Sequence, residues 1–194
     1  MPVDLLPVKD FIGLWGLTKF ERLKLSSNNP EFYPPNLIDF AINPVPKFGA
    51  RALNITHSYF DEKKNTVRSE YGFLIVKNRT KVDPRVHIGY LTTSSEGYSM
   101  MEQGFAKENK MFFHLKQFLR RSFEVGRNGT ELDVIEVCFH LFLENVRSEN
   151  VVGNLCSLEK VLELREPRVL ELRLKAETNS GIEGYSAEYN KIMP

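Results

Sequence analysis

The sequence is poor in cysteine, and its two cysteines, Cys138 and Cys156, stand in neither a metal-binding nor a redox spacing. Small secreted domains usually depend on several disulfides, whereas a reducing cytosol keeps isolated thiols free. The opening residues 1–15 mix Asp4, Lys9 and Asp10 with apolar side chains, unlike a signal peptide or a membrane anchor. We therefore expect a cytoplasmic protein with no signal peptide and no transmembrane segment.

An excess of charge of either sign is also missing. The 194 residues include 26 basic and 25 acidic residues, giving a formal net charge of +1. A protein that binds nucleic acid needs a basic surface to neutralise phosphates, so we expect no nucleic-acid partner. Single domains commonly contain ~100–200 residues, so residues 1–194 are predicted to form one domain. No feature of the sequence specifies an oligomeric state.

The motifs of common catalytic sites are absent as well. The chain has no glycine-rich phosphate loop, no HExxH and no GxSxG. Its four histidines are scattered along the sequence, at His57, His87, His114 and His140. A scattered histidine is more often a surface or interstrand residue than a metal ligand. The sequence therefore offers no catalytic motif, and it leaves the question of an enzyme activity open.

What the sequence does contain is a series of short alternating segments separated by turn residues. Residues 50–77 are typical of a β-hairpin around the polar turn 61–65, and residues 158–178 of another around Glu166 and Pro167. Further strands are predicted at 85–93, 96–107 and 182–191, and a short helix at 8–15. Many short strands and few helices indicate an all-β, antiparallel barrel or sandwich.

Two segments are compatible with more than one structure. Residues 110–125 fit either an extended pair or a helix. In residues 130–146 the polar side chains recur at Asp133, Glu136, His140 and Glu144, a helical spacing, although the β-branched and aromatic content favours a strand. Helix is slightly favoured there.

Alternation also assigns side chains to faces. In the closing strand Tyr185, Ala187 and Tyr189 share one face, which we predict to be the barrel lumen. In residues 66–77 Arg68 and Glu70 lie opposite Tyr71 and Phe73. Glu70 could meet an arginine or a ligand inside a barrel, but alternation favours the solvent face, with the aromatic residues inside.

Five segments, taken in order, resemble a known family. They are "PVKDFIGLW" (7–15), "FYPPNLIDF" (32–40), "ALNITHSYFDEKKNTVRSEYGF" (52–73), "TTSSEGYSMMEQGFAK" (92–107) and "FLRRSFE" (118–124). Their order and spacing are similar to those of nitrobindin-type barrels, which include the haem-binding domain of a THAP zinc-finger protein and relatives described as fatty-acid-binding-protein-like. The resemblance covers about three quarters of the chain, and single motifs are only moderately specific.

The resemblance implies a fold and an activity. The fold is an antiparallel up-and-down, lipocalin-like barrel of about ten strands. The family holds haem b at one mouth through a histidine of the last strand. Its members are linked to nitric oxide binding and to isomerisation of peroxynitrite to nitrate.

The chain departs from the family at the haem site. Tyr185 stands at the place of the family's histidine, and residues 127–155, with the possible helix, look like an insertion. We therefore predict a divergent barrel that has lost the histidine-ligated haem site and binds a small hydrophobic ligand, or acts as an interaction protein. The candidate pocket residues are Tyr185, Tyr189, Phe73, Tyr71 and His57.

An alternative keeps the haem. Tyr185 would then be the metal ligand, as a tyrosinate whose pKa a nearby cation lowers, and the chemistry would be that of a peroxynitrite isomerase. If haem is absent, the sequence specifies no cofactor.

Overall fold

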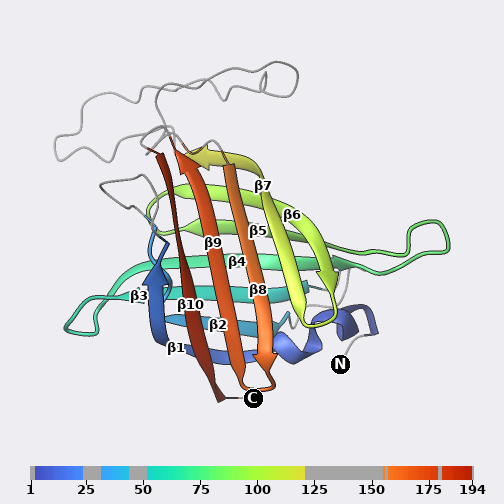
Figure 1. Ribbon diagram of the computed structural model, residues 1–194, viewed down its shortest axis with the longest axis horizontal. Coiled ribbons are helices and arrows are strands. Elements are labelled where there is room, and N and C mark those ends of the chain that lie inside the picture. The colour runs from blue at the N-terminus through green and yellow to red at the C-terminus, as the bar shows by residue number, and fades with distance from the viewer. Residues whose placement is uncertain are drawn as a thin grey trace.

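The computed structural model describes residues 3–23, 32–43, 52–120, 155, 157–178 and 181–193. Within them, ten antiparallel strands close into a barrel in which chain neighbours pair and β1 joins β10 (Figure 1). The elements are η1 Val3–Phe11, β1 Gly13–Arg22, β2 Leu37–Ile42, β3 Ala52–Phe60, β4 Thr66–Lys77, β5 Val86–Ser94, β6 Tyr98–Lys107, β7 Lys110–Arg120, β8 Ser157–Glu166, β9 Val169–Thr178 and β10 Gly181–Met193. The predicted all-β, up-and-down barrel is confirmed.

The strands follow the alternation of the sequence. In β9, Leu170, Leu172, Leu174 and Ala176 point into the barrel and are buried, while the intervening residues face outward. The two predicted hairpins are present as β3–β4 and β8–β9. Residues 110–120, for which the sequence left two structures open, form strand β7. The possible helix at 130–146 lies outside the described residues.

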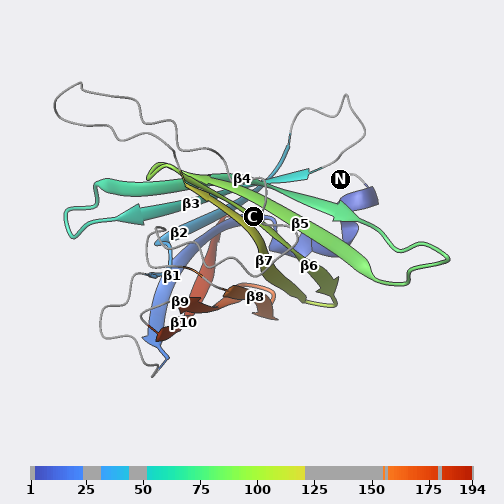
Figure 2. The same cartoon turned by 90° about the horizontal axis from the view of Figure 1, so that it is seen from above.

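One end of the barrel is closed by the 3-10 helix η1, which begins and ends earlier than the helix predicted at 8–15. Leu5, Val8 and Phe11 of η1 are buried, and η1 packs against β4 and β6 at this end of the barrel (Figures 1 and 2). Trp15 lies beneath it with no exposed surface, and its Nε1 donates a hydrogen bond to the carbonyl of Phe11 at 2.8 Å. We call this region the closed end.

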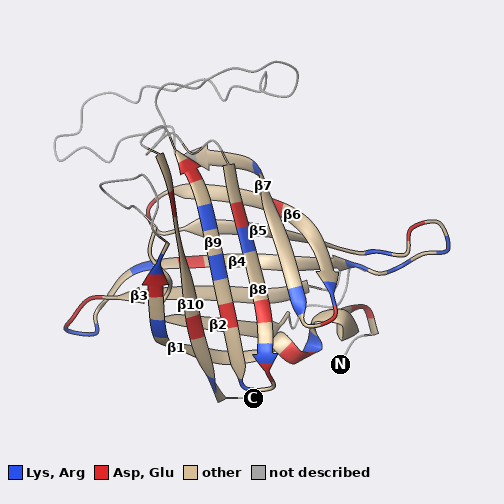
Figure 3. Ribbon diagram, viewed as in Figure 1, with Lys and Arg blue, Asp and Glu red and all other residues tan. Residues whose placement is uncertain are grey.

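The outer face of β7, β8 and β9 carries charges of both signs side by side (Figure 3). Glu163 accepts a hydrogen bond from Arg173 at 2.8 Å and forms ion pairs with Lys110 at 3.0 Å and Arg165 at 3.1 Å. The pairs with Arg173 of β9 and Lys110 of β7 are cross-strand pairs, which hold neighbouring strands in register.

The opposite end of the barrel, where β3 meets β4 and β5 meets β6, has a different interior. Buried charged or titratable side chains lie there, among them His57, Glu70, Glu102 and Lys160. We call this region the open end. Because buried charged groups are costly unless they are paired, their partners define the candidate site.

Candidate functional site

A cavity of about 290 Å³ lies inside the open end. Most of its wall is apolar, from Leu158, Leu172 and Leu174 on one side to Met100 and Phe118 on the other. Its remaining lining residues are Phe32, Tyr33, Pro35, His57, Tyr59, Arg68, Glu70, Glu96, Tyr98, Leu155, Lys160 and Tyr185. The volume lies at the lower end of the ~300–1,000 Å³ typical of small-molecule sites. We call it the open-end cavity.

Glu70 is the centre of a polar cluster on the cavity wall. Its Oε1 accepts hydrogen bonds from Nη2 of Arg68 at 2.6 Å and from the hydroxyl of Tyr98 at 2.6 Å. Its Oε2 lies 2.9 Å from Nδ1 of His57. Residues Glu70, His57, Arg68 and Tyr98 form what we call the Glu70 cluster, and its central carboxylate is only 4% exposed.

The electrostatics of this cluster fix where its protons lie. Burial acts to raise the pKa of Glu70, but the hydrogen bond and charge of His57, the charge of Arg68 and the Tyr98 hydrogen bond outweigh it, so the pKa lies well below its ordinary range. An ionised carboxylate only accepts hydrogen bonds, so Nδ1 of His57 carries the hydrogen between them. Burial, with the charge of Glu70, raises the pKa of Tyr98, which keeps its phenol protonated.

A second buried pair borders the cavity. Nζ of Lys160 lies 2.8 Å from Oε2 of Glu102, and the two side chains are 7% and 0% exposed. The same Nζ lies 5.2 Å from the centre of the Tyr90 ring. Oε1 of Glu102 and the hydroxyl of Tyr90 are buried with no hydrogen-bond partner among the described residues. The pair is electrically balanced, but its polar atoms keep unused hydrogen-bonding capacity.

The two tyrosines of the closing strand both point into the barrel but differ in role. Tyr185 is buried and lines the cavity, and its hydroxyl makes no hydrogen bond to the described residues. Burial, and then the charge of Glu70, raise the pKa of Tyr185. Tyr189 lies outside the described cavity lining, and its hydroxyl donates to the carbonyl of Pro35 at 3.0 Å. Tyr189 therefore anchors the segment before β2.

The faces of β4 are the reverse of those predicted. Tyr71 and Phe73 are 46% and 39% exposed and pack against each other outside the barrel, with ring centres 5.5 Å apart. The prediction that they line the pocket is wrong. Arg68 and Glu70 point inward, because their mutual hydrogen bonds and those of His57 and Tyr98 offset the cost of burying them. His57 lines the cavity, and its part in ligand binding stays a prediction.

Sequence reasoning missed Tyr98, Glu102 and Lys160. Lys160 had a detectable signal: it occupies the inward position between Leu158 and Leu162, in a strand whose other inward residues are aliphatic. A charged residue in the buried phase of a strand requires a buried partner. Glu102 supplies that partner from β6, a pairing that only the closed barrel reveals.

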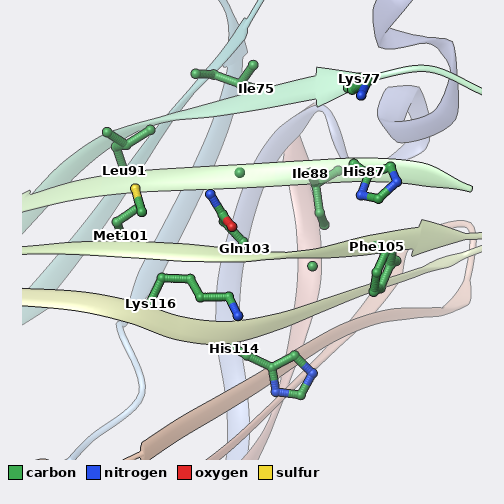
Figure 4. A pocket seen from close by; sticks show the side chains of 12 residues that line it. Ile75, Lys77, His87, Ile88, Leu91, Met101, Gln103, Phe105, His114 and Lys116 are labelled. Atoms are coloured by element: carbon green, nitrogen blue, oxygen red, sulfur yellow. The ribbon is translucent and has the colours of Figure 1, made fainter. Parts of the chain in front are cut away.

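A different hollow lies on the outer face of β4 to β7 (Figure 4). This outer groove, of about 490 Å³, has Ile75, Leu91 and Met101 in its apolar part and Lys77 and Lys116 among its polar residues. Gly89 deepens it, because a Cβ there would meet nothing within 4 Å. None of the residues predicted as a site lies in its lining.

The haem alternative can be tested against these contacts. A tyrosinate ligand needs a lowered pKa, whereas burial and the charge of Glu70 raise that of Tyr185 in spite of the opposing charge of Arg68. In the metal-free protein the surroundings of Tyr185 therefore disfavour the tyrosinate form that this ligation requires.

Comparison with known proteins gives a fold but no family. Neither a family model nor a curated protein matches the sequence. The crystal structure of Rv2717c from M. tuberculosis is similar over 98% of both chains, with a TM-score of 0.54 and 11% identity. At that identity the likeness supports the barrel fold alone.

A second solved structure, described as a nonspecific heme-binding cyclase that catalyses a cycloaddition during neoabyssomicin biosynthesis, matches over 93% of this chain and 64% of its own. Its TM-score is 0.26 with 9% identity, and we base no inference on it. Among the described residues, no helix is long and apolar enough to cross a membrane.

Proposed function

We propose that this protein binds a small, mainly apolar molecule with one uncharged polar end, that the open-end cavity is the site, and that the histidine-ligated haem site of nitrobindin-type barrels has been lost. The observation that carries the proposal is the cavity itself. It is enclosed by the strands, its wall is mostly aliphatic and aromatic, and its polar groups gather around Glu70 and Tyr185. Concave apolar sites with a few convergent polar groups are the usual form of small-molecule pockets.

The charges around the cavity favour an uncharged polar end. Glu70 is balanced by Arg68, and Glu102 by Lys160. A charged ligand would add an unbalanced charge to a buried site, which costs several kcal/mol of binding free energy unless it is paired. The hydroxyl of Tyr185 and the second ring nitrogen of His57 make no hydrogen bond to the described residues. A hydroxyl group of a ligand can use both, and a carbonyl oxygen can accept from the hydroxyl of Tyr185.

The haem-binding alternative receives less support, since it requires the tyrosinate that the surroundings of Tyr185 disfavour. The interaction-protein alternative rests on residues 127–155, nearly all of which lie outside the described residues. The prediction that residues 1–194 form a single domain with an insertion at 127–155 stays a prediction. So does the cytoplasmic location.

Native mass spectrometry tests the proposal directly. Protein purified without additives is expected to retain one small molecule, and Leu172→Trp, which fills the cavity, is expected to lose it. The matched control is Leu91→Trp in the outer groove, which is expected to keep the bound mass. Retention by the cavity-filled variant, or loss by the outer variant, would contradict the proposed site.

Titration with hemin distinguishes an apolar-ligand site from a haem site ligated by Tyr185. With one equivalent of hemin we expect no Soret band of a protein-ligated haem, in wild type or in Tyr185→Phe. A stoichiometric band in wild type that shifts in Tyr185→Phe would overturn the proposed loss of haem.

A further inference from the structure

We infer that Lys160 is a covalent attachment site, at which its amine condenses with an aldehyde ligand to form an imine inside the barrel. This inference rests on the proposed function and names the class of ligand: an apolar aldehyde small enough for the open-end cavity. Three observations on Lys160 support this inference: its side chain is buried, it lines the cavity, and a carboxylate is in contact with its nitrogen.

The position of Lys160 matches an apolar aldehyde. On the inward face of β8 it follows Leu158, and its register partner in β9 is Leu174. Both leucines line the cavity, so the apolar part of a ligand can lie against them while its carbonyl carbon approaches Nζ. Lys175, the residue next to Leu174, faces solvent on the outer surface of the barrel.

Glu102 supplies the proton transfers that imine formation needs. Its Oε2, at 2.8 Å, can accept a proton from the ammonium group, leaving a neutral amine with a free lone pair. The amine adds to the carbonyl carbon to form a carbinolamine, and Glu102 returns the proton to the hydroxyl, which leaves as water. In the balanced reaction, Lys–NH₃⁺ and R–CHO become Lys–NH⁺=CHR and H₂O.

The product keeps the buried site electrically balanced. One positive charge sits on nitrogen before and after the reaction, so the carboxylate of Glu102 faces a positive charge in both the reactant and the product. Tyr90 and Glu102 are register partners in β5 and β6, and Oε1 of Glu102 and the hydroxyl of Tyr90 have no hydrogen-bond partner among the described residues. They can therefore hydrogen-bond the carbinolamine hydroxyl or the released water.

Reductive trapping tests the inference. The full-length protein is incubated with octanal at or below one equivalent in the presence of sodium cyanoborohydride, and adducts are located by intact mass and peptide mapping. We expect one adduct, at Lys160, with occupancy about tenfold above that of Lys175 because the cavity holds the aldehyde against the buried amine. Equal labelling of surface lysines, or an unmodified Lys160, would overturn the inference.

A double variant and a surface control show whether the adduct depends on the Lys160 amine. Lys160→Met leaves the Glu102 carboxylate buried without its partner, so the double variant Lys160→Met/Glu102→Gln is the better test of the missing amine. It is expected to lose the adduct while a Lys175→Met control keeps it. An adduct of equal yield inside the double variant would place the reactive amine elsewhere.

The unreactive analogue 1-octanol distinguishes failure of the inference from failure of the proposed function. We expect excess 1-octanol to protect Lys160 and leave the slow labelling of Lys175 unchanged. If 1-octanol binds in the cavity but octanal does not modify Lys160, imine formation is overturned and the binding function stands. If neither molecule occupies the cavity, both fail.

Discussion

The closed end and the open end are built from the same ten strands but filled in opposite ways. At the closed end, η1 and Trp15 fill the interior with tightly packed apolar side chains. At the open end, Glu70 and Lys160 take inward positions and a cavity remains between them and the leucines. The difference shows how a small barrel can hold a costly polar cavity: one end contributes the packing that stabilises the fold, and the other carries the chemistry.

The largest expected effect follows from a cavity made at the closed end. Trp15→Ala removes a fully buried side chain and its hydrogen bond to Phe11, and should lower the free energy of unfolding by about 3–5 kcal/mol. Urea denaturation followed by circular dichroism measures this. A loss below ~1 kcal/mol would show that the closed end does not dominate stability.

Breaking the Glu70 cluster should cost less. Glu70→Gln keeps the shape of the side chain but removes the charge that Arg68 and His57 face, so we expect a loss of about 1.5–3 kcal/mol in unfolding free energy. The control Glu177→Gln changes an exposed carboxylate on β9 and should stay within ~0.5 kcal/mol of wild type. Equal effects of the two variants would contradict the role of the cluster.

Glu70 also predicts a dependence of stability on pH. Its pKa in the folded protein lies below the ordinary value of 4.5, so above pH 4.5 it is ionised in both states and its contribution is fully present. As the pH falls below 4.5, the unfolded chain takes up the proton first and the contribution is progressively lost. Wild type should therefore lose stability in this range more steeply than Glu70→Gln. Parallel slopes in urea titrations at a series of acidic pH values would contradict this assignment.

The smallest effect on stability is expected at Tyr185. Since its hydroxyl makes no hydrogen bond to the described residues, Tyr185→Phe should change the unfolding free energy by less than ~0.5 kcal/mol. The Tyr185→Phe variant should bind 1-octanol more weakly than wild type, by about 1 kcal/mol of binding free energy, which is the contribution of one hydrogen bond. Calorimetric titration checks this, with Phe73→Leu on the outer face as a control that leaves affinity unchanged. An unchanged affinity of Tyr185→Phe for 1-octanol would show that the Tyr185 hydroxyl does not bind the ligand.

The sequence predicted the barrel because alternation and turn residues are local signals. The hairpins at β3–β4 and β8–β9 and the shared face of Tyr185, Ala187 and Tyr189 follow from them. The inward face of β4 could not be predicted in this way. Alternation separates Glu70 from Phe73 but does not say which faces the lumen, and that choice depends on His57 and Tyr98, which come from other strands.

The pairing of Lys160 with Glu102 was hidden for the same reason. The two residues are 58 positions apart in the chain and meet only across the interior of the closed barrel. Sequence patterning finds a charged residue in a buried phase, but the partner that makes its burial tolerable is a property of the tertiary structure.

The central claim, that the open-end cavity is the binding site, is tested most directly by methyl NMR during titration with 1-octanol. We predict shift changes concentrated at Leu158, Leu172 and Leu174, with the closed-end methyls of Leu5 and Val8 and the outer-groove methyls of Ile75 and Leu91 unaffected. Shift changes confined to Ile75 and Leu91, or none at saturating 1-octanol, would contradict it.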